Sequence, residues 1–187
     1  NSSGHFSDDV AVKLLQHKDQ FVRGWTVRLL CDSYRVSSQV SAALTKLAFD
    51  EPYIYVRKQL ASSAKRLPTK DALPILRNLI NYDEDADDIH QPLLIWWALE
   101  SKASGDGREM ILDVVLSDAD IWKRALVQDH LVERLMKRYA VSGTREELLA
   151  AAQLLLVSPD DVSNRKLLKG FEDAFKGRSL AGIPQEL

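Results

Sequence analysis

The chain has 187 residues, 45% of them hydrophobic and 28% charged, and its formal net charge is −2. Its single cysteine, Cys31, excludes an intramolecular disulfide and a cage of several thiolates around a metal. The near-neutral charge gives no global field that would favour nucleic acid or a membrane surface. On that ground we expect no nucleic-acid binding. No apolar run is long enough to cross a bilayer, so we expect no membrane insertion either.

The charges are distributed unevenly along the chain. Residues 1–80 carry 12 Lys and Arg against 7 Asp and Glu, whereas residues 81–120 carry 2 against 11. Residues 121–187 are again slightly basic, with 11 against 9. The acidic middle argues against a nucleic acid that follows the whole surface, because its phosphates would be repelled there.

Six helical patterns follow one another in the first hundred residues. They are predicted from about 7 to 16, from 21 to 34, from 37 or 38 onward, from 52 to 66, from 69 onward and from 88 onward. Ser7 and Thr69 are the expected N-caps, and Pro52 and Pro92 are placed in first turns. Gly24 lies inside the second helix and weakens it by ~1 kcal/mol relative to Ala.

Further helices follow in the second half of the chain. Residues 104–107 (Ser-Gly-Asp-Gly) form the clearest break between elements. Thr144, with Glu147 three residues on, fits a capping box that opens the next-to-last helix. The last helix is predicted from 158–160 to Gly177. No window resembles a strand, so the sequence predicts an all-α fold.

A short signature recurs at a fixed spacing in this series of helices. Val22-Arg23 and Val56-Arg57 stand 34 positions apart, each after acidic residues and before an apolar helical stretch. Weaker copies begin at the acidic residues 83–88 and at Asp118. A period in the mid-thirties with two helices per unit predicts a HEAT-like α-α superhelix, a right-handed solenoid of stacked antiparallel helix pairs.

The organisation that follows is a single helical repeat domain over residues 7–177. We expect residues 1–6 to be an edge or linker and residues 178–187 to be a linker stub. Each helix has only one apolar stripe, too little to fold alone, so neighbouring units must stack.

The most polar segment, residues 83–90, is the best candidate for a binding site. Its possible metal ligands are Asp83, Asp85, Asp87, Asp88 and His90. The alternating acids resemble the start of a helix-loop-helix calcium loop, but position six lacks the Gly and position twelve the Glu that such a loop needs. The plainer interpretation is an anionic turn that complements the dipole of the following helix. A metal, a basic partner and a purely structural role remain open.

The four tryptophans and the basic residues offer further candidates. Adjacent Trp96 and Trp97 would suit a stacking platform for a sugar or base, although core packing is the plainer interpretation for them and for Trp25 and Trp122. We therefore keep these two residues as interaction candidates.

Arginines repeated at equivalent positions predict a ladder of ion pairs with the acids of the next unit. A phosphate patch is the alternative, but no Gly-rich loop supports it. Arg57 and Lys58 are the basic interaction candidates. No catalytic constellation is assembled by the sequence, so we assign no catalytic residue and no cofactor and expect no enzymatic activity of this chain.

The segments 19–30 and 50–64 resemble short HEAT-type repeats that contain Val-Arg. The stretches 53–62, 83–90 and 92–100 resemble, more specifically, the helical region of large exported proteins of planctomycete and verrucomicrobial bacteria. Those proteins are described as membrane-bound dehydrogenases or haem-binding proteins, with a β-propeller before the helical region and a cytochrome c-like module after it. Neither the propeller nor a Cys-x-x-Cys-His motif occurs in this chain.

The resemblance implies an exported, periplasmic location and the role of a connecting scaffold in a redox protein. Its partners would be other domains of a parent protein or a separate protein. The alternative expectation is a metal- or small-ligand-binding module centred on residues 83–90 and on Trp96 and Trp97.

Overall fold

The computed structural model describes residues 7–177, which form helices and no strand. The α-helices are α1 (Asp8–Leu15), α2 (Gln20–Cys31), α3 (Ser38–Asp50), α4 (Ile54–Ala64), α5 (Thr69–Leu79), α6 (Gln91–Glu100), α7 (Gly107–Met110), α8 (Ala119–Trp122), α9 (Val132–Ser142), α10 (Arg145–Val157) and α11 (Asp161–Phe175). Three short helical turns of other pitch intervene, namely η1 (Asp83–Asp87), η2 (Ile111–Val115) and η3 (Val127–Leu131). The expected segments 1–6 and 178–187 lie outside the described residues.

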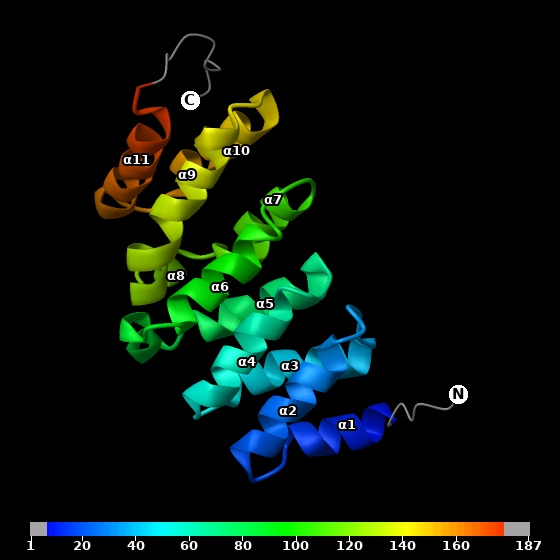
Figure 1. The fold of residues 1–187 in the computed structure, drawn as a ribbon. Coiled ribbons are helices and arrows are strands. Elements are labelled where there is room, and N and C mark those ends of the chain that lie inside the picture. Colours follow the sequence, from blue (N-terminus) through cyan, green and yellow to red (C-terminus); the bar gives the residue numbers. More distant parts are fainter. Residues whose placement is uncertain (1–6, 178–187) are drawn as a thin grey trace.

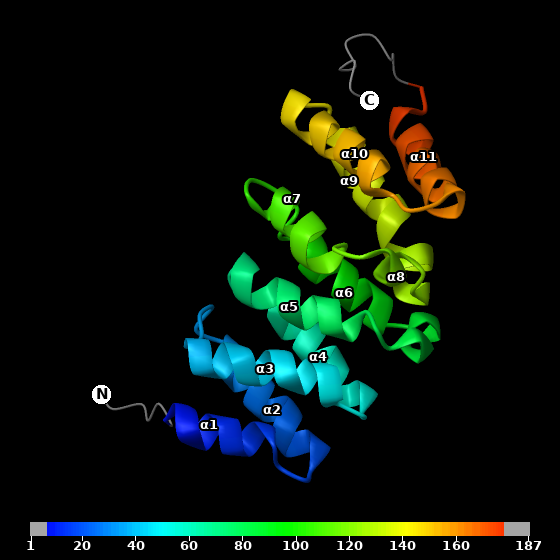
Figure 2. The same ribbon diagram turned by 180° about the vertical axis from the view of Figure 1, so that it is seen from behind.

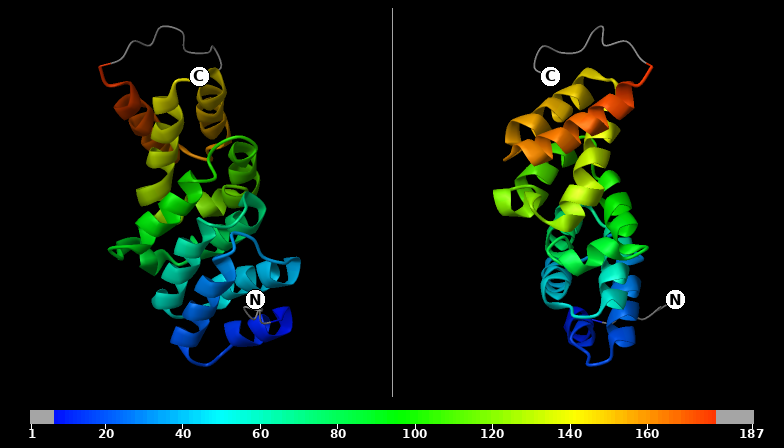
Figure 3. Two further views of the ribbon diagram at one scale, coloured as in Figure 1. Left: turned by 45° about the vertical axis from the view of Figure 1, so that its right-hand side comes forward. Right: turned by 90° about the vertical axis from the view of Figure 1, so that its left-hand side faces the viewer.

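The helices stack in two layers, which Figures 1 and 2 show from opposite sides. In one layer α1 packs on α3, α3 on α5, and α5 on η2. In the other, α2 packs on α4, α4 on α6, α6 on η3, and α9 on α11. The result is an elongated stack that begins with α1 and α2 and ends with α10 and α11 (Figure 3). The all-α prediction is therefore confirmed.

Several helix starts are explained by single capping side chains. The hydroxyl of Ser7 accepts from the backbone N–H of Val10, and that of Thr144 accepts from Glu147, both at 3.4 Å. Asp160 caps α11 in the same way, accepting from Ser163 at 2.8 Å. Each cap satisfies an N–H group that the first helical turn leaves unpaired, and all three starts agree with the sequence.

Three predicted starts were wrong by a few residues. Pro52 precedes α4, which begins at Ile54, and Pro68 occupies the cap position expected for Thr69. The sixth helix begins at Gln91, because the acidic residues before it form the separate turn η1. Pro92 does lie in the first turn of α6, where its missing N–H costs no hydrogen bond.

The core runs continuously between the two layers. Leu76, Ile95, Trp122 and Tyr139 are among its almost fully buried side chains, and Cys31 lies in it as expected. Among the described residues, no helix combines the length and apolar character that a membrane span requires.

Candidate interaction site

A ladder of buried ion pairs joins the first three helices of the α2–α4–α6 layer. Arg23 of α2 binds both carboxylate oxygens of Glu51, with Nε–Oε2 at 2.7 Å and Nη2–Oε1 at 2.6 Å. Arg57 of α4 repeats this geometry on Asp85, with Nε–Oδ2 at 2.7 Å and Nη2–Oδ1 at 2.5 Å. In both rungs the acid lies 28 residues beyond the arginine, in the next unit. The predicted ladder between units is confirmed.

Each guanidinium also holds backbone that would otherwise lack partners. Nη1 of Arg23 donates to the carbonyl of His17 at 2.7 Å, and Nη1 of Arg57 donates to the carbonyl of Glu51 at 3.0 Å. The side chain of Arg57 is only 4% exposed. Its planar fork is therefore used to fix the loop before α4 against the loop before α6, and it does not face a surface ligand.

The acidic segment 83–90 is held by several separate partners. Asp83 accepts from the backbone N–H of Ala125 at 2.9 Å and from Arg124 at 3.1 Å, whereas Asp85 binds Arg57. Asp88 forms an ion pair with Lys58 at 2.8 Å. No group of three potential metal ligands is found among residues 7–177.

The remaining two predicted metal ligands, Asp87 and His90, are not held by side-chain contacts of this kind. The side chains of Asp87 and His90 are exposed, and the backbone N–H of His90 donates to Asp88 at 2.9 Å. The arrangement agrees with the plainer interpretation of residues 83–90. In that interpretation the acidic side chains of the segment complement the start of α6 and the basic residues of neighbouring units.

Asp88 stabilises the start of α6, which gives a test by substitution. Its Oδ1 accepts from the N–H groups of His90 and Gln91, both at 2.9 Å. We expect Asp88→Ala to lower the free energy of unfolding at pH 7 by about 1 kcal/mol, as for the loss of a helix cap. Asp87→Ala, at an exposed neighbour, is the matched control and should change it by less than about 0.5 kcal/mol. Equal losses in the two variants, measured by urea unfolding, would contradict this role.

The same contacts predict the pH dependence of that stabilisation. Burial alone would raise the pKa of Asp88, but the Lys58 ammonium and the N–H groups of Gln91 and His90 outweigh it and lower this pKa to about 2. Because the folded-state pKa lies below the ordinary value, the contribution is complete above about pH 4 and is lost as the pH falls towards 2. The wild-type chain and Asp88→Ala should therefore converge in stability at acid pH.

The tryptophans divide into buried and exposed pairs. Trp122 and Trp96 are 1% and 9% exposed, so both belong to the interior. Trp97 is 47% exposed and Trp25 is 53% exposed. Packing was thus the right expectation for Trp122 and Trp96 but wrong for Trp25.

Exposed apolar side chains gather on the outer side of the α2–α4–α6 layer. We call this set the outer face, and it consists of Phe21, Trp25, Leu29, Tyr55, Leu93 and Trp97. Tyr55 is half-buried, and its ring centroid lies 5.1 Å from that of Phe21. Gly24 makes this contact possible, because a Cβ there would lie 2.5 Å from Cε1 of Tyr55.

The outer face continues the repeat of the ladder. Trp25 and Leu93 stand two periods of 34 residues apart, as do Leu29 and Trp97. The α4 positions between the members of these pairs are the polar Gln59 and the buried Ser63, so at these positions the exposed apolar side chains lie on α2 and α6 only. Single exposed apolar side chains are ordinary, but here several of them recur on one layer at the spacing of the repeat.

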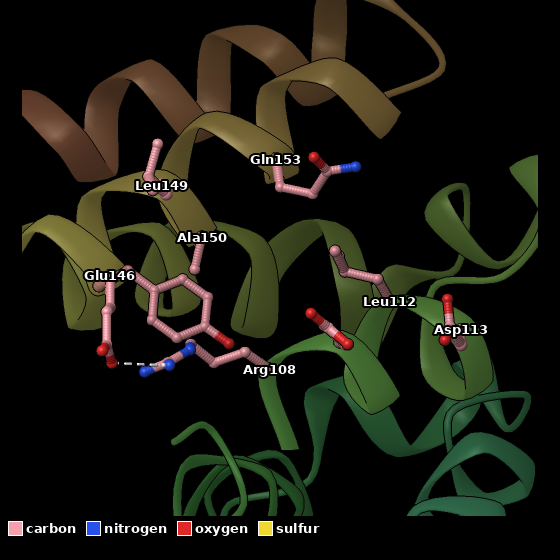
Figure 4. Close-up of a pocket in the computed structure, with 9 residues that line it drawn as sticks. Arg108, Leu112, Asp113, Glu146, Leu149, Ala150 and Gln153 are labelled. Carbon is pink, nitrogen blue, oxygen red and sulfur yellow. Dashed lines mark hydrogen bonds and ion pairs between the residues drawn. The ribbon is translucent and has the colours of Figure 1, made fainter. Parts of the chain in front are cut away.

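Two concave sites flank this layer and its neighbour. One, of about 450 Å³, lies between α6 and α9, and its wall includes Trp96, Glu100 and Arg134. The other, of about 560 Å³, lies between the α7–η2 segment and α10 (Figure 4). Both are within the range of pocket sizes that bind small ligands or single side chains.

In the second of these sites the one basic residue of the wall, Arg108, is already paired with acidic side chains. Arg108 reaches Glu146 at 3.0 Å, the dashed contact of Figure 4, and Glu147 at 3.5 Å. Glu147 also contacts Arg138 at 3.4 Å, so its carboxylate serves this network. The hydroxyl of Tyr139 is buried without a partner, and this burial, together with the charge of Glu147, raises its pKa. We assign no ligand chemistry to this site.

Sequence reasoning missed both concave sites. Their walls join segments that do not share the 34-residue repeat, and Arg108 and Glu146 stand 38 positions apart. The one available signal was the cluster of basic residues at 134, 137 and 138 on a helix with a strongly apolar opposite face. No protein-family model, curated protein sequence or solved structure matches the chain.

Proposed function

We propose that this chain is a non-catalytic helical-repeat scaffold that holds a protein partner against its outer face. The observation behind the proposal is the alignment of Trp25 and Leu29 on α2 with Leu93 and Trp97 on α6, all at least one third exposed. Tryptophan contributes more binding energy at protein interfaces than most residues, because its burial removes a large apolar area from water.

The repeat architecture supports the same proposal. The buried ion pairs of Arg23 and Arg57 fix successive units relative to one another, so we expect the outer face to be a rigid surface. We infer that the units wind as a HEAT-like right-handed superhelix, in which such a face would be extended and suited to a long partner segment.

The resemblance noted in the sequence sets a wider context for the proposal. It would make the chain a spacer that holds a sugar-dehydrogenase-like propeller and an electron-accepting module at a set distance in an exported protein. Redox activity would then belong to those modules, and the outer face would be the place where one of them docks. No contact of the described residues favours the alternative of a metal or ligand module on residues 83–90, whose three best-placed acids already have protein partners.

A peptide selection tests the docking role of the outer face. Random dodecapeptides would be selected on the immobilised chain and their affinities measured by calorimetry. We expect Trp25→Ser with Trp97→Ser to weaken the selected peptides at least about tenfold, which corresponds to about 1.4 kcal/mol. Phe49→Ser with Leu156→Ser is the matched control, because these exposed apolar residues lie on α3 and α10. Selected peptides that bind the Trp25 and Trp97 variant undiminished would overturn the proposal.

A further inference from the structure

The concave site between α6 and α9 contains an arginine whose hydrogen bonds are not completed. Nη1 of Arg134 is shielded from solvent and has no hydrogen-bond partner, and Arg134 forms no ion pair within residues 7–177. A guanidinium cannot lose its charge in a protein, so a buried N–H without an acceptor is a standing energetic cost. Arg134 also lines the site with a charge that no acidic side chain among residues 7–177 balances, so an anionic group in the site would pair with that charge.

The other walls of the site define what kind of anion fits. Lys137 and Arg138 add two cations, of which Arg138 shares the carboxylate of Glu147 at 3.4 Å. Glu100 provides one negative wall at the end of α6. The local charge is therefore positive, which favours an anionic ligand.

Apolar groups complete the site and join it to the outer face. The indole of Trp96 and the side chain of Val141 line it, and the next residue on α6 is the half-exposed Trp97. A ligand seated on Arg134 would thus have apolar surface beside its acid group. This combination suits a peptide that carries both acidic and apolar side chains better than a free inorganic anion.

Cations also follow the edge of the layer away from the site. The C-terminal ends of α2, α4 and α6 are followed or closed by basic residues, namely Arg28, Lys65, Arg66 and Lys102. Lys102 donates to the carbonyls of Lys65 and Leu67, and Arg66 donates to that of Arg28 at 3.4 Å, so these groups lie along one edge. Arg66 also pairs with Asp32 at 3.0 Å, so the excess positive charge of this edge comes from the other three cations, and it is complementary to an acidic chain that runs along the layer.

We propose that the site between α6 and α9 binds the carboxylate of an acidic side chain in a protein segment that lies on the outer face. Arg134 would hold the carboxylate in a two-bonded contact, Lys137 would add a third donor, and Trp96 would pack against the neighbouring residue. This inference rests on the proposed function, which it deepens by stating the chemistry of the partner.

Nuclear magnetic resonance with defined probes tests the inference on the whole chain. N-acetylated tetraglutamate is added at low salt while the side-chain N–H signals of Arg134 and Trp96 are followed. We expect a saturable shift of both signals, at least tenfold weaker binding by Arg134→Gln and several-fold tighter binding by Glu100→Gln. Lys137→Gln, on an exposed residue, should weaken binding in the same direction. Arg165→Gln, at an exposed position of α11, is the matched control and should bind as the wild type does.

Several results would overturn the inference. They are the absence of a saturable shift, unchanged affinity of a folded Arg134→Gln variant, and tighter binding of inorganic phosphate, tetralysine or a single-stranded oligonucleotide. The peptide selection separates this failure from failure of the scaffold proposal. Selected peptides that depend on Trp25 and Trp97 but carry no acidic residue would preserve the docking face and overturn the carboxylate site.

Discussion

Replacing Arg57 by Met is expected to lower the free energy of unfolding by about 3–5 kcal/mol. The substitution keeps much of the side-chain volume but leaves the carboxylate of Asp85, which is 1% exposed, without its cation. It also removes the donor to the carbonyl of Glu51. Urea unfolding followed by circular dichroism measures the loss as a lower midpoint at constant slope.

Matched variants separate this effect from general damage. Lys46→Met breaks the ion pair with Asp50, whose side chains are 74% and 50% exposed, and should cost less than about 1 kcal/mol. The double variant Arg57→Met with Asp85→Leu should recover much of the loss, because no buried charge then remains unpaired. A loss for Arg57→Met no larger than that for Lys46→Met would show that the rung does not stabilise the fold.

Much of this architecture could be predicted from local sequence. The Val-Arg repeat placed Arg23 and Arg57 at equivalent positions of successive units, and the ladder follows from that equivalence. Caps such as Ser7 and Thr144 were predictable because a hydroxyl before an apolar helical pattern has one favourable use. The errors at α4 and α6 arise where proline or a dense acidic run competes with helix initiation.

The candidate site was less accessible to sequence reasoning. Helical periodicity identifies which residues share a face, but it does not tell whether another element covers that face. Trp25 illustrates this limit: its helix has a buried side that includes Val27, yet more than half of the indole is exposed. The unpaired Arg134 is similar, because its lack of a partner depends on how α6 and α9 approach each other.

The repeat also shows where the ladder changes. Gln91 stands 34 residues after Arg57, and Ala119 stands 34 residues after Asp85. The third unit thus has neither the arginine nor the acid of the first two at that spacing. The side chain of Gln91 is fully buried, and both of its amide atoms lack hydrogen-bond partners. The third unit therefore buries a polar side chain without the acidic partner that the arginines of the first two units have.

We therefore expect Gln91→Met to raise the free energy of unfolding by about 1–3 kcal/mol. Methionine has a similar length and an apolar, flexible side chain, so it removes the desolvation penalty of the amide without opening a cavity. Gln59→Met is the matched control on α4, where the amide donates to the hydroxyl of Ser63 at 3.0 Å, and it should give no gain. Urea unfolding of both variants compares them directly. A loss of stability in Gln91→Met would mean that the amide is paired in solution, and that the third unit replaces the ion pair by another polar contact.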